Sequence, residues 1–113
     1  MNEIITHKSI NQERSQLINR ALVADLLRQE GVCSRATLAQ LSGLKQATIT
    51  NIIGEFIECG LVVETGLMSG CKGRRSIGVT LNDALYKVIG IRMTRRAFYI
   101  SIVGLSGKVY AVE

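Results

Sequence analysis

Residues 34–59 read "SRATLAQLSGLKQATITNIIGEFIEC", and this stretch decides the fold. Ser34 is a good N-cap, because its hydroxyl can accept hydrogen bonds from free amides two or three residues further on. Gly43 can adopt the left-handed backbone that ends a helix. We therefore expect a short helix over residues 35–42, a tight turn, and a second helix over residues 46–59.

The apolar residues of this stretch recur at helical spacing and predict which side of each helix is buried. The inward stripe of the second helix is Ile49, Ile52, Ile53, Phe56 and Ile57. The inward face of the short helix is Leu38, Ala39 and Leu41. Isoleucine and threonine give the second helix low intrinsic propensity, so we expect packing to stabilise it.

An earlier segment predicts a third helix. Residues 15–30 read "SQLINRALVADLLRQE", and Gly31 follows as a helix-ending residue. The apolar residues at three- and four-residue steps are Leu17, Ile18, Ala21, Leu22, Leu26 and Leu27. A start one turn earlier, near Ile10, stays open. Residues 1–14 are interpreted as a polar leader.

The segment after the second helix predicts a β-hairpin with a cationic tip. Two short apolar runs, "LVVE" and "IGVTL", flank the glycine-rich residues 65–76. Lys72, Arg74 and Arg75 lie in this tip around Gly73. Such a tip can reach a DNA minor groove or the flanking phosphates. The alternative is a solvated charged loop.

Residues 83–113 consist of short apolar runs separated by turn sequences, a pattern that predicts a β-meander. Strands are expected over residues 87–93, 97–103 and 108–112, with turns at "TRRA" and "LSGK". A meander of this size is too short to bury both of its faces alone. We therefore interpret it as the start of a second, incomplete domain.

Helix, short helix, tight turn, helix and hairpin is the order of a winged helix-turn-helix, an α+β fold over residues 15–82. In such a unit the N-terminal residues of the last helix face base edges in the major groove. The side chains at those positions can pair with bases: Gln46, Ala47, Thr48, Thr50 and Asn51. Arg35 and Lys45, near the starts of the two helices, are also assigned to the DNA-binding surface. Lys45 cannot cap its helix, so a phosphate could satisfy the free amides there.

The composition agrees with a DNA-binding protein and disfavours other classes. The 113 residues carry a formal net charge of +5, which favours a polyanionic partner such as double-stranded DNA. There is no long apolar run, so we expect neither a signal peptide nor a membrane span, and a cytoplasmic protein. Three widely spaced cysteines give no disulfide framework and no zinc pair. We find no catalytic set, metal ligands or cofactor motif and expect no enzyme.

Most of the chain resembles the N-terminal region of ROK-family repressors, the xylose-repressor-like and N-acetylglucosamine-repressor-like proteins. The stretches that carry the resemblance run from "INRALVADLL" to "ECGLVVETG", followed by "GRRS" and "LNDALYKVIGI". The specific marks are Asn19-Arg20, Ser34-Arg35, Gly43-Leu44, Ala47-Thr48-Ile49-Thr50, Gly60-Leu61 and Gly73-Arg74-Arg75. Each mark is modest alone, but their order and spacing together are specific.

The resemblance implies a transcriptional repressor of carbohydrate genes. It also implies an actin-like, sugar-kinase-related domain that follows, dimerises and binds a sugar effector, with residues 83–113 as its first strands. Residues 90–96, "GIRMTRR", lack the aspartate and glycine loop of the kinase members, so kinase activity is not expected. The alternatives are a fragment of a sugar-kinase-like protein and a winged-helix module that binds protein instead of DNA.

Overall fold

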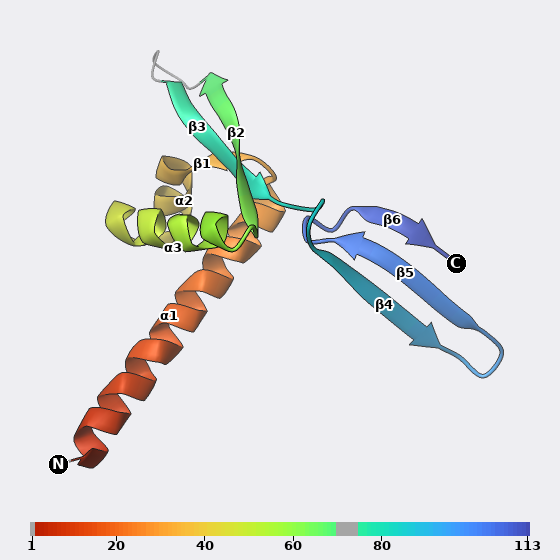
Figure 1. The fold of residues 1–113 in the computed structure, drawn as a ribbon, viewed down its shortest axis with the longest axis horizontal. Coiled ribbons are helices and arrows are strands. Elements are labelled where there is room, and N and C mark those ends of the chain that lie inside the picture. Colours follow the sequence, from red (N-terminus) through yellow and green to blue (C-terminus); the bar gives the residue numbers. More distant parts are fainter. Residues whose placement is uncertain (1, 70–74) are drawn as a thin grey trace.

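A computed structural model describes residues 2–69 and 75–113, and these residues form three helices and six strands (Figure 1). The helices are α1 (Asn2–Glu30), α2 (Arg35–Ser42) and α3 (Gln46–Glu58). The strands are β1 (Cys33–Ser34), β2 (Val62–Ser69), β3 (Arg75–Leu81), β4 (Lys87–Met93), β5 (Phe98–Gly104) and β6 (Val109–Val112). The fold therefore mixes helix and sheet. Its strands lie in two sheets, ordered β1-β3-β2 and β4-β5-β6.

The boundaries of α2 confirm the capping expectation. The Ser34 hydroxyl accepts a hydrogen bond from the amide of Thr37 at 3.1 Å, with Ser34 in extended backbone. At the other end, Gly43 has a φ of 72° and its amide donates to the carbonyl of Ala39. A left-handed backbone costs a glycine nothing, so this residue can end α2 and turn the chain toward α3.

The core of the first unit forms where the three helices meet the first sheet. The buried residues are Val23, Leu27, Cys33, Leu38, Ile49, Ile52, Ile53, Phe56, Val62, Val79 and Leu81. The stripe expected on α3 is confirmed, with Ile57 half-buried at its edge. On α2, Leu38 is buried and Ala39 is half-buried, as expected for the inward face. The expectation is wrong for Leu41, which is 49% exposed.

Helix α1 differs from the expectation in its start and in its buried face. It begins at Asn2, so the segment interpreted as a leader is helical in the described residues. The residues that pack are Val23 and Leu27, one turn apart, whereas Leu17 and Ile18 are exposed. Figure 1 shows that the first turns of α1 extend beyond α2 and α3, so the packed part of the helix is its C-terminal half.

The hairpin of β2 and β3 is longer than expected, and a short strand joins it. β2 and β3 are antiparallel and stay paired from Val62↔Leu81 out to Ser69↔Arg75. β1 pairs with the other edge of β3. The sequence does not predict this strand, because two residues are too few to show an alternating pattern.

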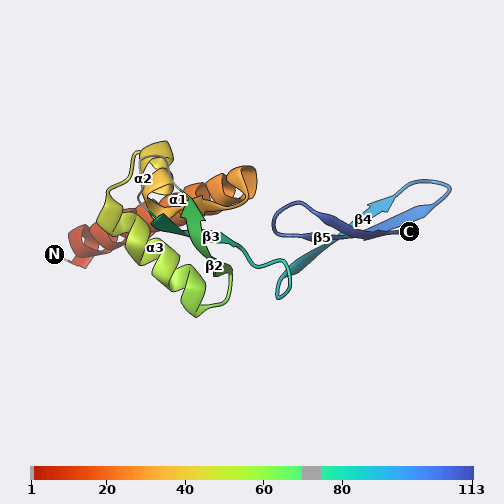
Figure 2. The ribbon, with the colours of Figure 1, turned by 90° about the horizontal axis from the view of Figure 1, so that it is seen from above.

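The second sheet projects from the first unit (Figures 1 and 2). Its apolar side chains are exposed on both faces. In β4, neighbouring residues Val88 and Ile89 are 54% and 65% exposed, although consecutive side chains of a strand point to opposite faces. The Cα radius of gyration is 17.9 Å, whereas a compact chain of this length would have about 13 Å. The long helix and the projecting sheet explain the difference.

A short connector, residues 82–86, joins the two units and is bonded to both. On the helical side, the Asn82 amide group donates to the carbonyl of Gly60 at 3.0 Å, and the Tyr86 hydroxyl donates to the carbonyl of Cys59 at 2.8 Å. On the other side, the Asp83 carboxylate accepts from the amide of Ser106 at 2.9 Å and from its hydroxyl. The connector thus ties the C-terminal end of α3 to the β5–β6 turn.

Candidate nucleic-acid interface

The outward face of α3 carries most of the residues assigned to base contacts. Gln46, Ala47, Thr50 and Asn51 are exposed, opposite the buried isoleucines. Thr48 is half-buried on the flank that faces α1. The Thr50 hydroxyl donates to the carbonyl of Gln46 at 2.9 Å, so its oxygen remains available as an acceptor. The face therefore presents two amide side chains, a hydroxyl oxygen and a methyl group.

The N-terminal end of α3 has no side-chain cap. Lys45 adopts the extended backbone of an N-cap, with φ −66° and ψ 148°, but its side chain makes no capping hydrogen bond. The carbonyl of Lys45 accepts a hydrogen bond from the amide of Ile49 at 3.1 Å, which begins the helical ladder. Free amides and the helix dipole give such an end partial positive charge, which favours an anion. The exposed Lys45 ammonium adds a full charge there.

Arg35 contacts the hairpin and not the outward face of α3. Its Nη2 atom is 3.0 Å from Oε1 of Glu64 on β2, and the two side chains are 25% and 47% exposed. The pair joins the start of α2 to the hairpin. A partly exposed ion pair is a weak bond, so a phosphate could still compete for the guanidinium.

The cationic tip of the hairpin is only partly described. Lys72, Gly73 and Arg74 lie outside the described residues, and Arg75 is described only by its backbone, as the first residue of β3. The assignment of these four residues to DNA binding therefore stays a prediction. The described strands lead directly to this tip, since the last pair before it is Ser69↔Arg75.

A polar crevice between α1 and α3 is a feature that the sequence does not predict. It has a volume of about 180 Å³ and is lined by Gln16, Asn19, Arg20, Thr48, Asn51, Ile52 and Glu55. Within it, Arg20 Nη2 is 2.8 Å and Arg20 Nε 2.9 Å from Oε2 of Glu55. These two residues lie 35 positions apart, so no local spacing could indicate the contact.

Two further observations on the described residues concern a thiol and possible metal ligands. Cys33 is buried in the core, where burial and then the nearby charge of Glu30 raise the pKa of its thiol. Within residues 2–69 and 75–113 no acidic, cysteine or histidine side chains gather as a metal site would require. None of the helices described has the length and apolar character needed to cross a membrane.

Comparison with known proteins gives several relatives that are named as transcriptional regulators or repressors. The chain is 34% identical over 103 residues to the DNA-binding transcriptional dual regulator NagC of Escherichia coli strain K12, covering 91% of this chain and 25% of that protein. It is 30% identical over 96 residues to the DNA-binding transcriptional repressor Mlc of the same strain, covering 84% and 24%. The xylose repressor of Caldicellulosiruptor bescii is also 30% identical over 96 residues, covering 85% and 24%. No family model matches the chain.

A solved structure resembles the fold as well. The crystal structure of a ROK family transcriptional regulator, described as a homologue of the Escherichia coli Mlc protein, aligns with a TM-score of 0.65 at 30% identity. The alignment covers 87% of this chain and 25% of that one. The chain thus spans about a quarter of the length of the relatives that it matches.

Proposed function

The chain is a homologue of ROK-family transcriptional regulators, and we propose that it binds DNA as the operator-reading part of a repressor of carbohydrate-utilisation genes. The observation that carries the proposal is the exposed polar face at the start of α3, in a chain whose relatives are named as transcriptional regulators. The net charge of +5 favours the same partner.

The first unit is proposed to be a winged helix-turn-helix, with α2, the Gly43 turn and α3 as its turn-helix element; the element order of three helices followed by a hairpin supports this. In this proposal α3 enters the major groove with its N-terminal end foremost. Gln46 and Asn51 supply amides that can pair with adenine, and Ala47 and the Thr50 methyl can contact the methyl group of thymine.

Phosphate contacts would hold α3 in register. The uncapped amides and Lys45 are one candidate anchor, Thr48 lies beside it, and Arg35 is a further cation at the start of α2. The hairpin tip, with Lys72, Gly73, Arg74 and Arg75, is proposed as the wing that reaches the adjacent minor groove or its phosphates. Its position at the end of β2 and β3 supports this role.

The second sheet is proposed as the first part of an actin-like domain, beginning near residue 83. Strands that are buried on both faces have nearly continuous apolar sequences. β4 has such a sequence, but its apolar side chains are exposed here, so a further part of a domain could cover them. The relatives are about four times as long as the matched segment, which leaves room for such a domain. Dimerisation and a sugar effector are proposed to depend on that larger domain.

A salt titration of DNA affinity tests the DNA-binding proposal. A protein that contacts phosphates should lose affinity as salt rises, with a log–log slope of about −0.9 for each phosphate contact. Replacing Gln46 or Asn51 by Ala should weaken operator binding by about 1–3 kcal/mol and relax base preference at one position per half-site. Gln12→Ala, which removes an exposed amide from α1, is the matched control and should bind as wild type.

Two outcomes would overturn parts of this proposal. Unchanged base preference of both α3 variants across a randomised operator library would remove α3 as the reading helix. Changing Arg74 and Arg75 together to Ala should make the salt slope shallower by about one unit for each phosphate that the tip no longer binds. If affinity and slope stay the same, the tip is a solvated loop, and if only the melting temperature falls, its role is structural.

A further inference from the structure

We propose that the crevice between α1 and α3 receives a backbone phosphate of DNA, with Arg20 as its cation and Glu55 as the residue that positions Arg20. This inference rests on the proposed DNA-binding function and extends the interface to a helix outside the turn-helix element. It assigns to α1 a direct contact with the DNA backbone.

One face of α1 is apolar in the core and polar beside the crevice. Val23 and Leu27 lie on the face of α1 that packs in the core. The same face continues toward the N-terminus through Arg20, Asn19 and Gln16, because residues three and four apart share a side of a helix. The stripe thus changes from apolar to polar where it leaves the core, and its polar part lines the crevice.

The crevice lies beside the proposed DNA-reading end of α3. Its opposite wall is α3, where Thr48 and Asn51 contribute to the lining, and both residues belong to the proposed DNA-reading end of that helix. A DNA backbone that flanks a major groove occupied by α3 runs past the sides of α3. The crevice therefore lies at the edge of the proposed contact surface and not behind it.

The side chains that line the crevice are mostly hydrogen-bond donors. Gln16, Asn19 and Asn51 carry amide donors, Thr48 a hydroxyl and Arg20 a guanidinium, and these groups suit phosphate oxygens. The volume of about 180 Å³ is large enough for several water molecules or an anion. The single carboxylate of the lining, Glu55, is already paired with Arg20.

The geometry of the ion pair leaves the guanidinium available to a second anion. Glu55 accepts through one oxygen from Nε and Nη2 of Arg20, so these bonds leave Nη1 without a partner among the described residues. The side chains of Arg20 and Glu55 are 35% and 52% exposed, so solvent and ligand can reach the pair. Holding a long side chain in one geometry before binding reduces the entropy cost of binding.

The two partners of this ion pair predict opposite effects on DNA binding. Arg20→Met should lower DNA affinity about tenfold at moderate salt, and the salt slope should become shallower by about 0.9. Glu55→Gln keeps the shape of the side chain and an oxygen that can accept from Arg20, so Arg20 stays in position while a negative charge beside the DNA is removed. Its affinity should equal or exceed that of wild type, with a slope at least as steep.

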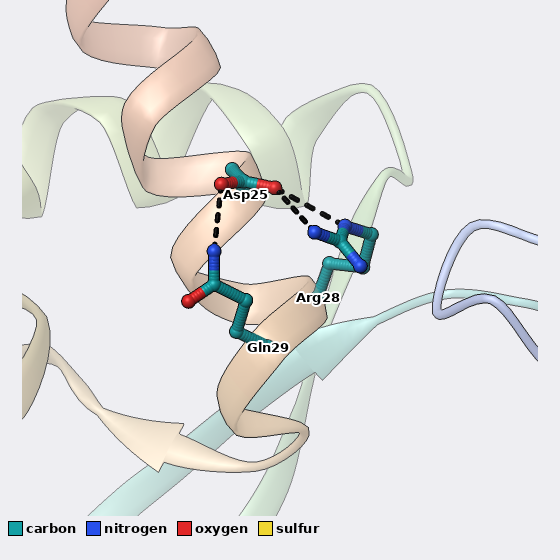
Figure 3. A network of polar contacts seen from close by, with 3 residues as sticks. All are labelled: Asp25, Arg28 and Gln29. Atoms are coloured by element: carbon teal, nitrogen blue, oxygen red, sulfur yellow. Dashed lines mark hydrogen bonds and ion pairs between the residues drawn. The ribbon is translucent and has the colours of Figure 1, made fainter.

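Arg28→Met is the matched control for Arg20→Met. Arg28 lies on the same helix and is also paired with a carboxylate, Asp25, at 2.8 Å. Figure 3 shows that its partner belongs to α1 itself, with Gln29 on the other carboxylate oxygen. Removing this charge changes the net charge as much as Arg20→Met does, without touching the crevice. The control should therefore bind DNA nearly as wild type does.

The outcomes separate this inference from the proposed function. If wild type binds DNA but Arg20→Met and Arg28→Met have equal affinities and slopes, the phosphate contact is wrong while the DNA-binding proposal stands. If Arg20→Met and Glu55→Gln weaken binding alike and both lower the melting temperature, the pair only braces two helices, and the inference is likewise overturned. If wild type shows no salt-dependent DNA binding, both proposals fail.

Discussion

The uncapped start of α3 predicts that helix stability and DNA affinity can be changed in opposite directions. Ser34 and Lys45 occupy equivalent N-cap positions, and their backbones are alike, with φ −85° and ψ 161° at Ser34 and φ −66° and ψ 148° at Lys45. Ser34 caps α2 through its hydroxyl, whereas Lys45 makes no cap. A serine introduced by Lys45→Ser should therefore place its oxygen on the free amide of Thr48, as Ser34 does on that of Thr37.

The comparison with Lys45→Ala isolates the cap, because both variants lack the same charge. A serine cap stabilises a helix by about 1 kcal/mol relative to alanine. In a unit of this size that difference should raise the melting temperature of Lys45→Ser above that of Lys45→Ala by about 4–8 °C. If a DNA phosphate uses the same amides, it must displace the new hydroxyl, and Lys45→Ser should bind DNA about fivefold more weakly than Lys45→Ala.

Thermal melts and fluorescence anisotropy with a labelled operator at fixed salt measure both effects on the same samples. Equal DNA affinities in the presence of the expected gain in melting temperature would refute phosphate binding at this helix end. An absent gain in melting temperature would instead refute the equivalence of the two N-cap positions.

Three further variants test the fold and its connector. Leu38→Ala removes a fully buried side chain and should destabilise the first unit by about 2–5 kcal/mol in denaturant titrations. Ser34→Ala removes the cap of α2 and should cost about 1–2 kcal/mol in the same assay, and a change below about 0.5 kcal/mol would contradict the capping role. Burial acts to raise the pKa of Asp83, but hydrogen bonds from Ser106 and Tyr110 outweigh it and lower the pKa below the ordinary 3.8. The stability that Asp83 contributes is therefore present above that value and disappears as pH falls through the lowered pKa. The difference in melting temperature between wild type and Asp83→Asn should accordingly be smaller in acid than at neutral pH.

Local signals are enough to predict α2, α3 and β4. The N-cap at Ser34 and the turn at Gly43 fix boundaries through short-range backbone chemistry, and both are visible in the sequence. The period of α3 identifies its buried stripe because neighbours cover that helix along most of its length.

Sequence-based prediction fails where the answer depends on how elements meet. The apolar residues of α1 offer two possible faces, and only the place where α2 and α3 cross the helix selects Val23 over Leu17. The same crossing brings Arg20 to Glu55, a contact that no sequence spacing encodes. The first turns of α1 have no apolar stripe, so the periodicity cannot indicate that the helix begins at Asn2.

The connector at residues 82–86 has a mechanical consequence for α3. Its side chains donate hydrogen bonds to the carbonyls of Gly60 and Cys59, at the C-terminal end of α3. The residues proposed to contact bases lie at the opposite end of that helix. Thirteen residues at 1.5 Å each make α3 a rod of about 20 Å, so a tilt of about 5° at the connector displaces the far tip by about 1.7 Å. Because hydrogen bonds tolerate only about 0.5 Å, a tilt of that size at the connector would be enough to break the proposed hydrogen bonds from α3 to the bases.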